Sequence, residues 1–220
     1  MTKSNDLSLK QRTKVLLWLV PMKAKLKPIS IRELQYKKNL SKGKSFQFHH
    51  SRGYVRKVLS DIFNIQPLKV PLYSPPFTPP KLPDKWGYVS FSHCNDALFI
   101  CWSSSKVGVD IEKVDRSIDY LGIMEKIFIK KEIEFFLSKK FNNPRKEFLK
   151  LWVKKEAAVK LEEGSIINDF KTLMPIPNKN EILNTSNDNT INSYLFEYKN
   201  WFLSLATKKK IIKNTTICIM

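Results

Sequence analysis

A proline-rich stretch near the first third of the chain, QPLKVPLYSPPFTPPKLPDK at residues 66–85, constrains the fold most strongly. It holds more than half of the chain's twelve prolines. Each proline fixes its φ angle and lacks a backbone N–H, so this stretch cannot form a regular helix or a central β-strand. We therefore predict an extended connector here. With 220 residues, 42% of them hydrophobic, the chain can bury a core as one large domain or as two small lobes.

Periodicity predicts the elements on either side of this connector. Residues 12–20 are typical of a strand, and residues 50–63 carry apolar side chains at helical spacing. After the connector, three β-prone runs indicate an antiparallel meander: 88–91, 97–102 and 107–112.

The rest of the chain alternates helical and turn signals. A helix is predicted from about 119 to 139 and a second from 144 to 163, with Asn143 as its N-cap and Pro144 in its first turn. The polar run 184–190 predicts a loop, and residues 194–206 predict a hairpin that turns at Lys199 and Asn200.

Positive charge is concentrated at the start of the chain. The chain carries 39 Lys+Arg against 20 Asp+Glu, a formal net charge of +19, and residues 1–57 hold 15 of the basic residues but only Asp6 and Glu33 as acids. Such an excess favours a polyanionic partner: nucleic acid, a phosphorylated ligand, an acidic protein or a membrane surface. The alternative is a lysine-rich surface that is simply solvated.

Cysteine use and hydropathy indicate the compartment. Cys94, Cys101 and Cys218 form no C-x-x-C pair and are odd in number, which favours a reduced protein. The apolar run 15–20 is stopped by Pro21 and is too short to span a bilayer. It also lacks a signal-peptide cleavage site, so we expect a cytoplasmic protein that uses no membrane.

Two acids stand one residue apart in the apolar run GVDIE at residues 108–112. If this run is a strand, Asp110 and Glu112 point to the same side, while Val109 and Ile111 point into the core. The alternative is an edge strand whose acids face water.

The helix LWVKKEAAVKLEEG adds a third carboxylate. Trp152, Glu156 and Lys160 share one face because they are spaced by four residues. The alternative is an exposed amphipathic helix, but the large ring of Trp152 indicates that this face meets protein. Three carboxylates converging from a strand and a helix would provide oxygen ligands for Mg²⁺, which commonly takes substrate phosphates into its shell.

The motifs together resemble a known family. VGVDIE, with 41 residues between Asp110 and Trp152, and then WVKKEAAVK resemble the paired signature (I/V)-G-(I/V)-D and W-x-x-K-E-x-x-x-K of the Sfp-type 4′-phosphopantetheinyl transferases. Three further segments are similar to the family's other motifs, in the same order: SRGYVRKVLSDIF, VSFSH and KIFIKKE.

The resemblance implies a fold, an activity and partners. The fold is α+β, with two similar lobes of antiparallel sheets packed on helices, at residues 1–105 and 106–220, related by a pseudo-twofold axis around a coenzyme A cleft. The activity is transfer of the 4′-phosphopantetheine arm of coenzyme A to a serine of an apo acyl or peptidyl carrier protein, with release of 3′,5′-ADP. Mg²⁺, or Mn²⁺ in its place, is the implied metal, and a monomer is expected.

Carried over by position, the resemblance also implies roles for single residues. Asp110, Glu112 and Glu156 would bind the metal, and Lys160 would contact the phosphate under attack, with Lys155 in support. The general base stays open between Glu156, Glu132 and a metal-bound water.

A second group would bind the 3′-phosphate end of coenzyme A. It consists of Ser92 and His93, with Arg56 and Arg52 adding positive charge there. In TPPKLP, Thr78 and Pro79 stand where the family has Gly and Lys. A lysine that contacts coenzyme A is therefore missing there, and Lys81 could replace it.

Two alternatives stay open at this point. One is a nucleic-acid-binding module built from the basic N-terminal region with interleaved Phe46, Phe48 and Tyr54. Against it, we expect Phe46 and Phe48 to alternate as in a strand and to pack in the core, and a phosphate groove has no use for Asp110 and Glu112. The other is an inactive relative that acts as a binding protein. We favour the enzyme, whose acidic carrier protein the +19 charge would attract.

Overall fold

The computed structural model describes residues 12–211 and 217–220, and they form two compact units. The C-terminal unit comprises Val107–Ile211, and the N-terminal unit comprises Thr13–Lys106 together with strand β11 (Ile217–Ile219). The chain passes from the N-terminal unit to the C-terminal unit after Lys106, which follows the serine run 103–105.

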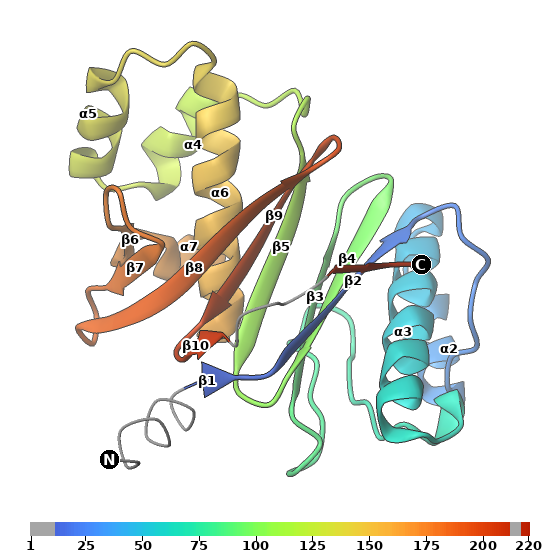
Figure 1. The fold of residues 1–220 in the computed structure, drawn as a ribbon. Coiled ribbons are helices and arrows are strands. Elements are labelled where there is room, and N and C mark those ends of the chain that lie inside the picture. Colours follow the sequence, from blue (N-terminus) through green and yellow to red (C-terminus); the bar gives the residue numbers. More distant parts are fainter. Residues whose placement is uncertain (1–11, 212–216) are drawn as a thin grey trace, which may run out of the picture. The chain divides into compact units, whose positions relative to one another are not determined.

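A four-stranded sheet forms the base of the N-terminal unit (Figure 1). Its order is β11, β2 (Val15–Pro21), β4 (Ala97–Ser103) and β3 (Tyr88–His93). Strand β4 runs antiparallel to both β2 and β3, whereas β11 lies parallel to β2. The predicted strands at 12–20, 88–91 and 97–102 are confirmed.

Helix α3 (Lys42–Phe63) covers this sheet and follows the short helix α2 (Ile31–Lys38). Its buried Val55, Val58 and Leu59 join a core cluster with Leu98 and Ile100 of β4. The predicted helix at 50–63 is confirmed, but it begins earlier, at Lys42.

The prediction that Phe46 and Phe48 alternate in a strand is wrong. Both lie in α3, where a spacing of two residues puts side chains on different faces, so Phe48 is buried while Phe46 is 43% exposed. Tyr54 is buried as well. Phe48 and Tyr54 therefore belong to the core rather than to a surface for stacking bases.

The proline-rich connector has the predicted extended character. Its regular structure is limited to the 3₁₀ turn η1 (Pro67–Lys69) and one isolated bridge between Tyr73 and Lys81. Helix α3 ends before the first proline, at Phe63, with Asn64 in the left-handed conformation (φ 51°) as its C-cap. The connector then carries the chain to β3.

The C-terminal unit is built on a five-stranded antiparallel sheet. Its order is β5 (Val107–Lys113), β9 (Trp201–Thr207), β8 (Asn189–Tyr198), β7 (Glu181–Asn184) and β6 (Leu173–Pro175). The predicted hairpin is confirmed as β8–β9, whose turn places Lys199 at a φ of 51°. The shortest strands are β1 (Arg12–Thr13) and β10 (Lys210–Ile211).

The predicted three-stranded meander is wrong in its third strand. Strand β5 does not continue the sheet of β3 and β4 but pairs with β9, with Val109 opposite Leu205 and Ile111 opposite Leu203. All four of these side chains are buried. Pairing β5 with β9 buries the apolar side chains of both strands. The partner of a strand that lies far away in the sequence cannot be predicted from the local pattern.

Five helical segments accompany this sheet: α4 (Tyr120–Ile127), α5 (Lys130–Ser138), α6 (Pro144–Leu161), α7 (Ile166–Asp169) and the 3₁₀ turn η2 (Phe170–Thr172). The predicted helix at 119–139 is divided at Phe128, whose backbone is extended (φ −99°, ψ 158°). This break lets the Phe128 ring pack on Phe148 and Phe170. The start of α6 is as predicted, since the Asn143 side chain accepts a hydrogen bond from Lys146 N–H and Pro144 is the first helical residue.

The fold class is confirmed as α+β with antiparallel sheets packed on helices, apart from the parallel pair of β11 and β2. Among the described residues, no helix is both long and apolar enough to cross a membrane.

Candidate active site

The close approach of α6 to β5 organises the C-terminal unit, and Gly108 permits it. A Cβ atom at position 108 would lie 1.9 Å from the carbonyl oxygen of Ala157 and 2.5 Å from the backbone nitrogen of Leu161. Both atoms belong to the helix backbone and cannot rotate away. Only glycine therefore allows the helix to lie this close to the strand.

Asp110 lies two residues further along β5 and meets the C-terminal turns of α6. Lys160 donates a hydrogen bond from Nζ to Asp110 Oδ1 at 2.7 Å. The Asp110 side chain is only 5% exposed, so the alternative of an acid facing water does not hold for it, although β5 is an edge strand. Glu156, one turn before Lys160, places Oε2 3.8 Å from the same Nζ.

Glu112 completes the group of acids and has its own cation. Arg116 donates a hydrogen bond from Nη1 to Glu112 Oε1. The structure thus brings Asp110, Glu112, Glu156 and Lys160 close enough to shift one another's pKa values, together with Arg116. We call these five residues the carboxylate cluster.

Burial and mutual repulsion dominate the protonation of this cluster. Burial, and then the charge of Asp110, raise the pKa of Glu112 and that of Glu156 to about 7 each. Burial alone would lower the pKa of Lys160, but Asp110 and Glu156 outweigh it and raise the pKa. The acids are therefore crowded, and a further cation would relieve their repulsion.

The chemistry of these donors fits a hard divalent cation such as Mg²⁺, because all three acids offer carboxylate oxygens. Within residues 12–211 and 217–220, no group of three or more His, Cys, Asp or Glu side chains is arranged to hold a metal ion. Lys160 and Arg116 take up the Asp110 and Glu112 oxygens instead. Each of these cations holds one oxygen of its carboxylate, Asp110 Oδ1 and Glu112 Oε1.

Lys155 and Glu132 form a separate ion pair. Lys155 points from α6 toward α5 and donates to both carboxylate oxygens of Glu132, at 2.7 and 2.8 Å. Its ammonium also lies 4.3 Å and 4.8 Å from the ring centres of Phe128 and Phe170. Burial lowers the pKa of Lys155 to about 8, against the opposing effect of Glu132. Burial also raises the pKa of Glu132.

This second pair joins α5 to α6. Because both Glu132 oxygens accept hydrogen bonds from one buried ammonium, its geometry is that of a positioning group. Glu132 also accepts a hydrogen bond from Ile129 N–H at the start of α5, at 3.4 Å.

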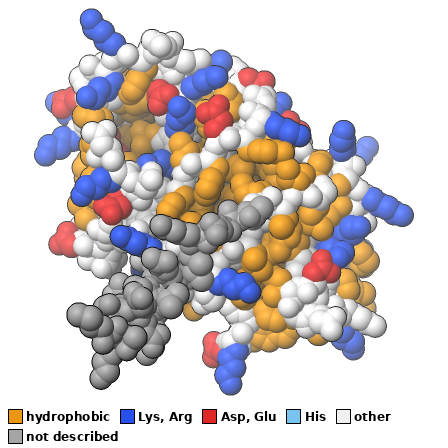
Figure 2. Space-filling view, in the orientation of Figure 1, with side chains coloured by type: hydrophobic (Ala, Val, Ile, Leu, Met, Phe, Trp, Pro, Cys, Tyr) orange, Lys and Arg blue, Asp and Glu red, His pale blue; other side chains and the backbone are white. Residues whose placement is uncertain are grey.

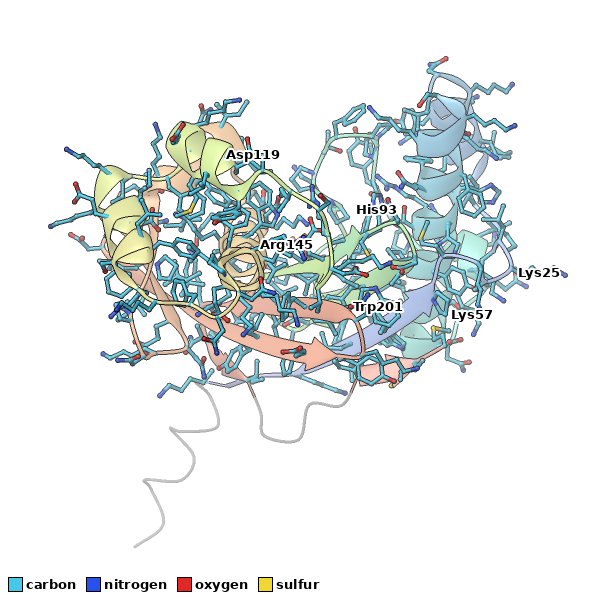
Figure 3. The ribbon with its side chains drawn as sticks, turned by 90° about the horizontal axis from the view of Figure 1, so that it is seen from above. Lys25, Lys57, His93, Asp119, Arg145 and Trp201 are labelled. Carbon is cyan, nitrogen blue, oxygen red and sulfur yellow. The ribbon has the colours of Figure 1, made fainter. Side chains whose placement is uncertain are left out.

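The residues predicted to bind the 3′-phosphate of coenzyme A lie in the N-terminal unit. Ser92 and His93 end strand β3, opposite Phe99 and Leu98. Figure 3 labels His93. Lys81 exchanges backbone hydrogen bonds with Tyr73. Their contacts with coenzyme A stay predictions.

Arg52 is enclosed within the N-terminal unit. Its guanidinium donates to the carbonyls of Ser74 and Pro75, both at 3.1 Å, and lies over the rings of Phe48 and Phe91. Burial lowers its pKa to about 10, which leaves the side chain charged near neutral pH.

Arg56 is engaged even more completely. It makes a two-pronged ion pair with Glu33, at 2.7 and 3.1 Å, and donates to the carbonyls of Pro67, Val70 and Leu72. Its five N–H groups are thus all directed at partners inside the protein. Its predicted contact with coenzyme A stays untested, and the observed contacts join α2, α3 and the connector.

Sequence reasoning gave no structural role to three residues that shape these sites: Gly108, Arg116 and Glu33. Arg116 lies four residues after Glu112, but the segment between them is not helical. A spacing of four predicts a side-chain contact only in a helix. Glu33 closes a capping box with Ser30, and the S-x-x-E pattern could have revealed this role. The N-cap of α4 is likewise a local signal: Asp119 (Figure 3) accepts a hydrogen bond from Gly122 N–H.

Comparison with known proteins bears on this region directly. The family model of the 4′-phosphopantetheinyl transferase superfamily matches residues 106–217. This range contains the whole carboxylate cluster and the Lys155–Glu132 pair. A search of curated proteins finds no matching sequence. With half of its length matched, the chain belongs to the 4′-phosphopantetheinyl transferase superfamily.

Proposed function

We propose that this protein transfers the 4′-phosphopantetheine moiety of coenzyme A to a serine of an apo acyl or peptidyl carrier protein, in an Mg²⁺-dependent reaction. The serine oxygen would form a bond to the β-phosphorus of coenzyme A while the bond to 3′,5′-ADP breaks. The observation that carries the proposal is the Asp110–Lys160 pair at 2.7 Å, flanked by Glu112 and Glu156, inside the matched region.

The proposal assigns the metal to Asp110, Glu112 and Glu156. Bound Mg²⁺, or Mn²⁺, would offset the negative charge of the coenzyme A pyrophosphate. The pKa values of about 7 for Glu112 and Glu156 support this assignment, because such crowded acids gain most from a nearby cation.

Lys160 has the chemistry to act on the phosphate. Its raised pKa keeps the ammonium charged, and its partial exposure leaves it accessible from solvent. The ammonium would donate to a phosphate oxygen of coenzyme A and stabilise the negative charge that develops there.

The proton of the carrier serine needs an acceptor. Glu156 is favoured over Glu132, because both Glu132 oxygens are held by Lys155. We assign Lys155 and Glu132 to positioning α6.

The partner assignment rests on charge. Carrier proteins are acidic, and a net charge of +19 would attract them and coenzyme A through long-range electrostatics. The pseudo-twofold relation of two similar lobes, and binding of the 3′-phosphate by the Ser92 and His93 region, belong to the same proposal.

The test is incubation with coenzyme A, Mg²⁺ and a panel of apo carrier proteins, with intact mass as the readout. We expect a phosphopantetheine adduct on at least one carrier, and absence of an adduct on every carrier would refute the proposal. The variant Asp110→Asn should slow transfer by about a hundredfold or more. Asp61→Asn is the matched control, since Asp61 is an exposed acid paired with Lys57 on α3.

The same variants separate this function from nucleic-acid binding. Loss of Asp110 should remove transfer but leave or strengthen binding of a DNA duplex, because one negative charge is removed. Transfer at the wild-type rate by Asp110→Asn would exclude this carboxylate from the mechanism.

A further inference from the structure

A surface groove lies in the C-terminal unit, apart from the carboxylate cluster. It runs between α5, α6 and the segment 174–179, and its volume is about 630 Å³. Its walls are mainly apolar: Phe135, Phe141, Leu151, Met174, Ile176 and Leu195. Figure 2 shows hydrophobic side chains in the region where Figure 1 draws α5 and α6, with basic side chains around them. This size and lining are typical of sites for small organic ligands.

One basic side chain of the lining is exceptional. Lys154, on α6, is half-buried, and burial lowers its pKa. It makes no ion pair with any described residue. By contrast, Lys150 is paired with Glu147 at 2.8 Å, and Lys179 lies 3.9 Å from Glu181.

The position of Lys154 is unfavourable without a partner. The two acids that line the groove do not relieve it, because Glu132 is paired with Lys155 and Glu147 is paired with Lys150. A half-buried ammonium loses hydration, and an anionic group at hydrogen-bond distance offsets that loss. The single unpaired half-buried cation therefore calls for a single anionic group.

The apolar lining of the groove determines the chemistry of the rest of the ligand. Exposed Phe135, on the rim, and the inner side chains of α6 and β8 offer apolar contact rather than hydrogen bonds. A ligand that fills this space must have an apolar body, since polar groups placed there would lose water without gaining partners.

We propose that this groove binds an amphiphilic carboxylate, a small molecule with one carboxylate on Lys154 and an apolar chain along Phe135, Leu151 and Leu195. A row of unpaired half-buried cations would instead favour the acidic helix of a partner protein, whereas the described part of the groove holds one such cation, Lys154. This site does not depend on the proposed transferase function, and it is tested without coenzyme A or metal.

The experiment compares decanoate with 1-decanol, both below the concentration at which they aggregate, by isothermal titration calorimetry on the full chain. We expect saturable binding of decanoate at one site. The ion pair should favour decanoate over decanol by about tenfold or more. Lys154→Met, which keeps the apolar length of the side chain, should remove this preference and leave decanol binding unchanged.

Lys131→Met is the matched control, because Lys131 lines the same groove but is exposed. It should change decanoate binding by no more than about twofold, as expected for a surface charge. Phe135→Glu, at an exposed wall position, should weaken decanoate without affecting folding. Thermal unfolding of each variant verifies that the fold is retained.

Three results would overturn the inference. They are no decanoate binding by the wild-type protein, equal affinity for decanoate and decanol, or wild-type decanoate binding by Lys154→Met. Lys154-dependent binding of an acidic amphipathic peptide made of Leu and Glu, without decanoate binding, would also overturn it and identify a protein segment as the occupant.

Discussion

Replacing Gly108 by alanine tests the physical basis of the candidate active site. The new Cβ would lie 1.9 Å from the Ala157 carbonyl oxygen, whereas ordinary contact begins at 3.4 Å. Helix α6 must therefore move away from β5 by about 1.5 Å, or the strand must bend by the same amount. Truncating a side chain cannot help, since the atoms in conflict are backbone.

Two consequences follow from that movement. Overpacking of a dense interface typically costs about 1–3 kcal/mol, and contact with a helix backbone puts Gly108→Ala at about 3 kcal/mol, the upper end. In addition, the Asp110–Lys160 hydrogen bond of 2.7 Å would be broken. A displacement of about 1 Å at a reacting centre can lower the rate by about a hundredfold.

Urea unfolding and carrier modification by intact mass provide the two measurements. Gly43→Ala is the control, because a Cβ at Gly43 meets nothing within 4 Å and the residue lies in helix α3. It should be neutral or should stabilise the protein by up to about 1 kcal/mol. If Gly108→Ala unfolds at the wild-type urea concentration and keeps full activity, the reasoning about the close approach is wrong.

Three further predictions concern burial and charge. Glu33→Gln should destabilise the fold by about 3 kcal/mol or more in urea unfolding, because it leaves the guanidinium of Arg56 buried without its anion; a loss below about 1 kcal/mol would contradict this role. His50 donates from Nε2 to the Pro21 carbonyl, and burial lowers its pKa below 6.5, so the unfolded chain binds the proton more readily. Stability should therefore fall as the pH drops below 6.5, by at most about 1.4 kcal/mol per pH unit, and His50→Gln should reduce this slope. Raising NaCl should increase the KM for the carrier more than it changes kcat, and equal effects on both would count against electrostatic attraction.

Local patterns predicted much of the fold. The proline-rich connector, the Asn143–Pro144 start of α6 and the turn at Lys199 depend on residues close in sequence, and all three were correct. The errors lie where distant contacts compete with local preference. The break at Phe128 exists because its ring packs with Phe148 and Phe170, and no pattern within 119–139 contains that information.

The candidate site, too, could be predicted from the sequence only in part. The sequence by itself determined which side chains share a face, Asp110 with Glu112 and Glu156 with Lys160, because the periods of strand and helix are local properties of the backbone. Only the tertiary structure decided that these two faces meet. That outcome required β5 to pair with β9 instead of β4 and Gly108 to admit the helix. The pairing of distant strands is selected by the total apolar surface that it buries. Burial of the acids in the resulting structure is also what raises the pKa of Glu112 and Glu156 to about 7.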